Sequence, residues 1–323
     1  CIPILVARAI KSGTRFHFVC AVVAISALVP ANSDGSWIAA GVCFLVFLCR
    51  QDTTYKECVA LFRLMAASCA VWVFNGVRGM LLPVHSPLRT ISAIMGFLPV
   101  CLLGAILCLG IAFLLEKRQL PLRKIGIGLS ITTMVLLLVG VVFFTVTKVS
   151  FLGLESLLRL DQTWGSNRGY LWYILMLVYG RLSPLEKLFG AGGDSIYSLL
   201  NPHYTQYIIA LNGSTFDSAH NEFLQHLVCG GLVGVGCWIA FLVGRIAKGW
   251  KYYPEVSLGL LAYGVQSFFS ISTPGVLPVV FLMGALATIK PQEEKIESQE
   301  KAMAVALAVT IGLVAVLIGN LVF

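Results

Sequence analysis

The chain has 323 residues, of which 58% are apolar and only 12% are charged. A soluble domain has roughly 45–50% apolar and about 25% charged residues, so an ordinary water-soluble enzyme is excluded. The formal net charge is +8, and the basic residues gather in short clusters between apolar runs. This distribution indicates orientation in a membrane and argues against nucleic acid as a partner.

The apolar runs predict an all-α, polytopic transmembrane bundle of about nine spans. They lack the alternation of apolar and polar residues that an outer-membrane β-strand has. Two of them are shorter than the roughly 20 residues of a perpendicular span and could be kinked or re-entrant: 36–49 and 275–289. A chain that begins at Cys1 without a basic leader is consistent with a fragment lacking its first helices. The nine runs are residues 17–31, 36–49, 58–81, 90–115, 125–147, 222–244, 255–272, 275–289 and 303–323.

The Lys and Arg residues are divided unequally between two alternating sets of loops. The first set has 14 of them in 42 residues: 11–17, 50–56, 116–124, 245–251 and 290–301. The second set has 7 in 91 residues: 32–36, 78–89, 148–218 and 273–275. By the positive-inside rule the first set is cytoplasmic and the second is extracytoplasmic.

The segment 148–218 is too long and too polar to be a simple connection between spans, so we expect function there. Its most helical part, 168–182, has an apolar body too short to cross a bilayer and predicts an interfacial helix. A glycine turn at 188–194 and an irregular stretch at 201–213 follow, and Asp217 and Ser218 are predicted caps of the next helix. These features divide the chain into N-terminal transmembrane helices (1–147), an extracytoplasmic catalytic loop (148–219) and C-terminal transmembrane helices (220–323).

His220 and Asn221 follow the predicted caps, which places them in the first turn of a helix about to enter the membrane. The positive end of a helix dipole disfavours a second proton on the imidazole, and a neutral histidine is what a general base requires. The alternative is a histidine that only caps or anchors the end of the helix.

Arg168 opens the predicted interfacial helix, and Arg89 begins the fourth run on the same side of the membrane. Arginine suits bidentate binding of phosphate. The alternative is snorkelling to lipid head groups, which is the main expectation for Arg181 and Lys187. No Gly-Lys-Ser/Thr follows Gly190 and Gly192, so no nucleotide-binding P-loop is predicted.

A divalent metal site is not expected, because the sequence has no Asp-x-Asp pair. Asp194, Asp217 and Glu222 could still assemble one in space. We therefore expect no metal and no other cofactor.

Four motifs occur in order between about residues 160 and 240: Arg168-Gly-Tyr-Leu-Trp172, Pro184-Leu185 ahead of Gly190-x-Gly192, Ser218-Ala-His220-Asn221, and Gly230-Gly-Leu-Val-Gly234. Together they resemble the O-antigen ligase and polymerase superfamily of bacterial envelope membrane proteins, and the likeness extends loosely from about residue 86.

The resemblance implies transfer of a glycan from an undecaprenyl-diphosphate carrier to an acceptor hydroxyl, outside the cytoplasmic (inner) membrane. It implies a catalytic His220 with two arginines and no metal. Arg168 matches the first arginine, and Arg89 is the second, with Arg78 as its substitute. The matching motifs also give Asn221, Trp172, Gly190 and Gly192 as substrate-binding residues.

The expected partners are the lipid-linked glycan donor, a glycan, lipid or protein acceptor, and membrane lipids. Ligase and polymerase differ only in the acceptor, and the sequence does not separate them. A lipid-linked oligosaccharide flippase or other transporter is the alternative function, although transporters typically show internal repeats or paired broken helices near the middle of the membrane.

Overall fold

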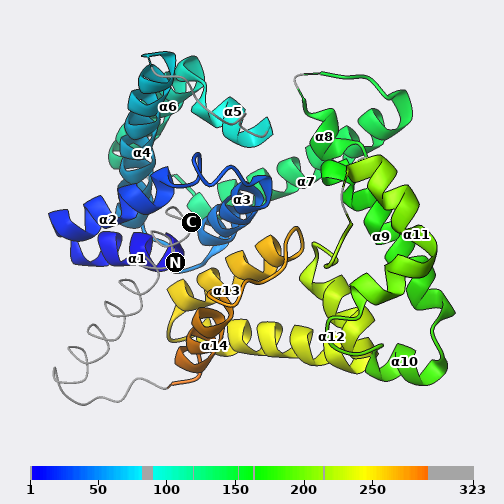
Figure 1. Cartoon of the computed structure of the whole chain (residues 1–323). Coiled ribbons are helices and arrows are strands. Elements are labelled where there is room, and N and C mark those ends of the chain that lie inside the picture. Colours follow the sequence, from blue (N-terminus) through cyan, green and yellow to red (C-terminus); the bar gives the residue numbers. More distant parts are fainter. Residues whose placement is uncertain are drawn as a thin grey trace.

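The computed structural model describes residues 2–81, 90–118, 120–151, 153–162, 164–213 and 215–289. Every regular element in these ranges is a helix, which confirms the all-α class (Figure 1). Within these ranges, four helices are long and apolar enough to cross a membrane. They are α4 (Tyr55–Leu81), α6 (Leu98–Lys117), α7 (Leu122–Thr147) and α12 (Glu222–Gly249).

Most of the other predicted runs form shorter helices than expected, although α3 covers the whole run 36–49 and starts two residues before it. Three apolar helices have 10 to 17 residues: α2 (Arg15–Ser26), α3 (Asp34–Cys49) and α14 (Leu277–Leu286). The run 255–272 ends early, giving α13 (Pro254–Ser267), and the run 303–323 lies outside the described residues. A helix that the run lengths did not predict, α1 (Ile2–Ser12), precedes them.

The fourth predicted run, 90–115, is divided into α5 (Thr90–Gly96) and α6. Phe97 between them has an extended backbone, and Pro99 lies in the first turn of α6. Proline is accepted at the start of a helix but removes a backbone donor within one. The break therefore follows from the position of Pro99.

Close approaches of backbone hold the bundle together. A Cβ on Gly126 of α7 would lie 2.9 Å from the backbone of Leu48 in α3, and one on Gly104 of α6 would lie 3.3 Å from Cys69 in α4. The Trp72 indole donates to the carbonyl oxygen of Ser26 at 3.0 Å. Figure 1 shows α4 and α6 running side by side, as their packing requires.

Residues in or next to loops of the same predicted set meet in the structure. At one end, the amide nitrogen of Ile91 donates to Asp34, and Thr90 hydrogen-bonds to Ser156 at 2.9 Å between hydroxyl oxygens. At the other end, Lys11 pairs with Glu255 at 3.2 Å and the Tyr55 hydroxyl donates to the carbonyl oxygen of Leu120. The first end carries the residues around His220, because α12 starts there.

The segment 148–219 folds into four helices: α8 (Glu155–Leu158), α9 (Trp164–Arg181), α10 (Pro184–Phe189) and α11 (Ile196–Asn212). The prediction of an irregular stretch at 201–213 is wrong. Ile196, Leu200 and Ile208 are buried at multiples of four residues, which is the helical spacing that the polar residues between them masked.

The predicted interfacial helix is α9, whose bounds begin at Trp164. Gly165 and Asn167 have positive φ, so continuous right-handed helix starts at Arg168, where the sequence predicted it. One face of α9 is buried in a core shared with α11 and α12, which includes Leu171, Ile174 and Leu175. Tyr173 and Met176 on the opposite face are exposed. The helix is thus tied to protein on one side, and only its other side is open to a membrane surface.

Candidate functional site

His220 lies just before α12 rather than in its first turn. The N-cap is Asn221, whose Oδ1 accepts a hydrogen bond from the amide nitrogen of Leu224 at 3.0 Å. The prediction that Asp217 and Ser218 cap this helix is wrong. His220 has a left-handed backbone with φ of 48°, and a right-handed helix cannot continue back through such a residue.

Trp172 of α9 holds the segment that precedes His220. Its indole Nε1 donates to the carbonyl oxygen of Ala219 at 2.9 Å, and the amide nitrogen of Ala219 donates to Gln225 Oε1 at 2.9 Å. The Phe216 ring meets the His220 ring edge-on, with 5.7 Å between centroids. Trp172, predicted to bind substrate, is therefore brought to the His220 loop as a hydrogen-bond donor.

Arg168 is the fifth residue of α9, four residues before Trp172. Residues four apart share a face of a helix, so Arg168 is on the face of α9 that reaches the His220 loop. The preceding turn is unusual, since Gly165 and Asn167 both have positive φ. Arg168 is half-buried, whereas Arg181 at the other end of the helix is exposed.

The remaining predicted arginines are not placed. Arg89 lies outside the described residues, and so does the side chain of Arg78. Thr90, the neighbour of Arg89, hydrogen-bonds to Ser156 of α8. This contact places the start of α5 against the segment that leads into α9.

The glycine turn after α10 packs into a kink of α12. A Cβ on Gly190 would lie 2.1 Å from the carbonyl oxygen of Cys229, and the kink occurs at Gly231, where φ is 67°. The amide nitrogens of Ala191 and Gly192 donate to the carbonyl oxygens of Val228 and Cys229 at 3.0 and 3.1 Å. Close packing therefore requires glycine at position 190, and a φ of 106° favours glycine at position 192, where a Cβ would meet nothing. Substrate binding by the two glycines stays a prediction.

A capping box fixes α10 ahead of this turn. The Ser183 hydroxyl accepts from the amide nitrogen of Glu186, and the Glu186 carboxylate accepts from the amide nitrogen of Ser183. Hydrogen bonds from Ser183 stabilise the charged carboxylate and lower the pKa of Glu186.

Sequence reasoning missed the partner of Glu222, which it weighed only as a possible metal ligand. The Glu222 side chain is 7% exposed and accepts two hydrogen bonds from Ser272, in the loop between α13 and α14. A carboxylate at the start of an apolar helix is a signal for a buried partner. Nothing in the sequence around Ser272, fifty residues later in the chain, indicated that it is this partner. No group of three His, Cys, Asp or Glu residues suited to a metal ion occurs within the described ranges.

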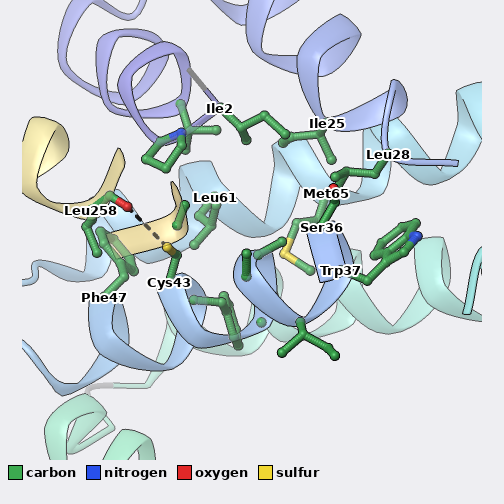
Figure 2. A pocket seen from close by; sticks show the side chains of 18 of the residues that line it. Ile2, Ile25, Leu28, Ser36, Trp37, Cys43, Phe47, Leu61, Met65 and Leu258 are labelled. Atoms are coloured by element: carbon green, nitrogen blue, oxygen red, sulfur yellow. Dashed lines mark hydrogen bonds between the residues drawn. The ribbon is translucent and has the colours of Figure 1, made fainter. Parts of the chain in front are cut away.

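A cavity of about 1210 Å³ lies among α1, α3, α4, α6, α13 and α14. Figure 2 shows its mainly apolar wall, with the Cys43 thiol donating to the carbonyl oxygen of Leu258. Trp37 and Gln266 line it toward the end of the bundle where α12 starts, and Lys11 and Glu255 line it at the other. None of the predicted site residues that the structure describes, including His220 and Arg168, lines this cavity.

Residues 89–239 match the family model described as O-antigen ligase. This part of the chain is similar to O-antigen ligase. The match confirms the predicted resemblance and covers every residue predicted for the site, from Arg89 to Asn221. No curated protein and no solved structure matches the chain.

The match to O-antigen ligase implies glycosyl transfer of the O-antigen ligase or polymerase type, with a lipid-linked glycan and an acceptor as substrates. The matched region runs from the start of α5 into the middle of α12. Of the four described helices that can span a membrane, it contains α6 and α7 and the first part of α12. The O-antigen ligase region is thus part of a multi-pass membrane protein. Ser272 and the helices α13 and α14 lie beyond it.

Proposed function

We propose that this protein transfers a glycan from an undecaprenyl-diphosphate carrier to an acceptor hydroxyl at the extracytoplasmic face of the bacterial inner membrane. One observation carries the proposal. The Trp172 hydrogen bond to Ala219 joins the helix that presents Arg168 to the loop that presents His220, inside the region that matches O-antigen ligase.

The proposed reaction is an in-line displacement at the anomeric carbon of the donor. The acceptor oxygen forms a bond to C1, and the bond between C1 and the phosphate oxygen breaks with its electron pair remaining on the lipid diphosphate. His220 takes the proton of the acceptor hydroxyl as general base. Arg168 and Arg89 bind the diphosphate and stabilise its increasing negative charge. Attack from the face opposite the leaving group inverts the configuration at C1.

The test is the purified protein in proteoliposomes with an undecaprenyl-diphosphate-linked glycan and an acceptor glycan. The expected product is a new glycosidic bond whose anomeric configuration, measured by NMR, is the opposite of that in the donor. Retention of configuration would contradict direct displacement by the acceptor. Movement of the intact donor across the bilayer with no new bond would favour the flippase.

Two interrupted helices give the transporter alternative some support, because transporters place substrates at broken helices. The breaks are at Phe97, between α5 and α6, and at Gly231 in α12. The second break, however, is filled by protein: a Cβ on Gly231 would lie 2.4 Å from the backbone of Leu188. This contact leaves no room for a substrate at Gly231, and glycosyl transfer is the better proposal.

The proposal also requires the His220 end of α12 to face outward. Gln162, ahead of α9, and Gln51, between α3 and α4, are exposed residues from the two opposite sets of loops. In a cysteine-free background, a cysteine at position 162 is expected to react with an impermeant maleimide added to cells whose outer barrier is permeabilised. A cysteine at position 51 is expected to react only after lysis. The reverse pattern would remove the site from an extracytoplasmic substrate.

A further inference from the structure

Glu222 holds together two parts of the chain that the family match does not join. Its Oε2 accepts from the amide nitrogen of Ser272 at 2.7 Å and from the Ser272 hydroxyl at 2.6 Å. The Ser272 hydroxyl also hydrogen-bonds to the hydroxyl of Tyr263 in α13. A buried carboxylate is costly unless such donors satisfy it, so this loop and the start of α12 are fixed to one another.

Aromatic contacts bring the same loop to α9. Phe268 meets the Trp172 ring edge-on with 5.5 Å between centroids, and its ring lies 6.3 Å from that of Phe223 in α12. Phe269 next to it lies 6.3 Å from Trp164. The loop after α13 therefore contacts the helix of Arg168 as well as the helix that follows His220.

His220 lies between these attachments. Before it, the backbone of Ala219 is hydrogen-bonded to the side chains of Trp172 and Gln225. After it, Asn221 caps α12 and Glu222 is hydrogen-bonded to Ser272. A left-handed backbone is strained for a non-glycine residue and persists only where the surrounding contacts fix it. The hydrogen bonds on both sides of His220 fix its backbone in this conformation.

We propose that Glu222 is a positioning residue, whose bond to Ser272 fixes the backbone at His220 and so directs the imidazole at the acceptor hydroxyl. This inference rests on the proposed role of His220. Both donors from Ser272 occupy Glu222 Oε2, and Oε1 faces His226 Nε2 at 3.6 Å in the next turn of α12. The carboxylate therefore acts on the reaction through the backbone that it holds.

The test compares Glu222→Gln and Ser272→Ala with wild type in the reconstituted transfer assay. Displacement of a catalytic group by about 1 Å can cost on the order of 100-fold in rate, so kcat is expected to fall by about 10- to 100-fold. The KM for the lipid-linked donor is expected to stay within about twofold, because the diphosphate is bound elsewhere. Ser272→Thr retains the hydroxyl and is expected to recover most of the activity lost in Ser272→Ala.

Glu255→Gln is the matched control. Glu255 is also a largely buried carboxylate that pairs with another helix, but it lies at the opposite end of the bundle, against Lys11. Its loss is expected to lower the melting temperature of the detergent-solubilised protein and leave kcat unchanged. If Glu222→Gln and Ser272→Ala behave like Glu255→Gln, with a lower melting temperature and normal kcat, the positioning role is wrong. A change confined to the KM for the donor would also overturn it.

The assay with His220→Ala separates this inference from the proposed function. Full transfer by His220→Ala would refute the base assignment and the positioning role with it. An inactive His220→Ala together with full kcat in both Glu222→Gln and Ser272→Ala would refute the positioning role alone.

Discussion

Replacing His220 by alanine is expected to lower kcat for glycan transfer by about 10²–10⁴-fold, the range that a general base contributes. The acceptor hydroxyl would then have to lose its proton to water during attack on C1. Expression and membrane insertion should stay near normal, because His220 is outside the α12 helix and the contacts on either side belong to Ala219 and Asn221. The measurement is initial transfer rate per molecule of folded protein in proteoliposomes.

His17→Ala is the control for this experiment. His17 lies near the start of α2 and its Nδ1 hydrogen-bonds to the Thr14 hydroxyl at 2.6 Å, in a loop of the opposite set. Like His220→Ala, this variant removes one histidine, but it should not alter the rate of transfer. If His220→Ala transfers glycan at the wild-type rate, the histidine is an anchor of the helix end and the base assignment fails.

Replacing Arg168 by lysine is expected to lower transfer about 10- to 100-fold, although the positive charge remains. A guanidinium binds a diphosphate through two parallel hydrogen bonds, which an ammonium cannot reproduce; a hydrogen bond to a charged group contributes about 1.5–3 kcal/mol. Arg181→Lys is the matched control, because Arg181 is exposed at the other end of the same helix. There an ammonium reaches the membrane surface as well as a guanidinium does.

The same assay in EDTA distinguishes an arginine clamp from a metal ion. Transfer is expected to survive chelation, since the proposed diphosphate site consists of Arg168 and Arg89. An enzyme that tolerates Arg168→Lys, loses activity in EDTA and regains it with Mg²⁺ or Mn²⁺ would contradict the clamp. Stabilisation of the leaving diphosphate would then be assigned to a cation held by Asp194, Asp217 or Glu222.

Sequence reasoning found the helices of the site but not how they meet. The motif around His220 and the helix containing Arg168 are local in sequence, and the family match confirms the resemblance that they suggested. The cap was misplaced from Asn221 to Asp217 and Ser218, because Asp, Asn and Ser favour caps about equally. Only the φ of 48° at His220 decides where α12 begins. α11 was missed because its polar residues hid a buried stripe at Ile196, Leu200 and Ile208.

The sequence by itself determined that this is a helical membrane protein with an O-antigen ligase region. Hydropathy and short motifs are properties of consecutive residues, and the bilayer selects on them directly. The tertiary structure decided which residues surround His220. Ala219 accepts a hydrogen bond from Trp172, which lies forty-seven residues earlier in the chain. Glu222 accepts one from Ser272, which lies fifty residues later. Such pairs depend on how α9, α12 and α13 pack against one another, and packing across that distance leaves no pattern in a single sequence.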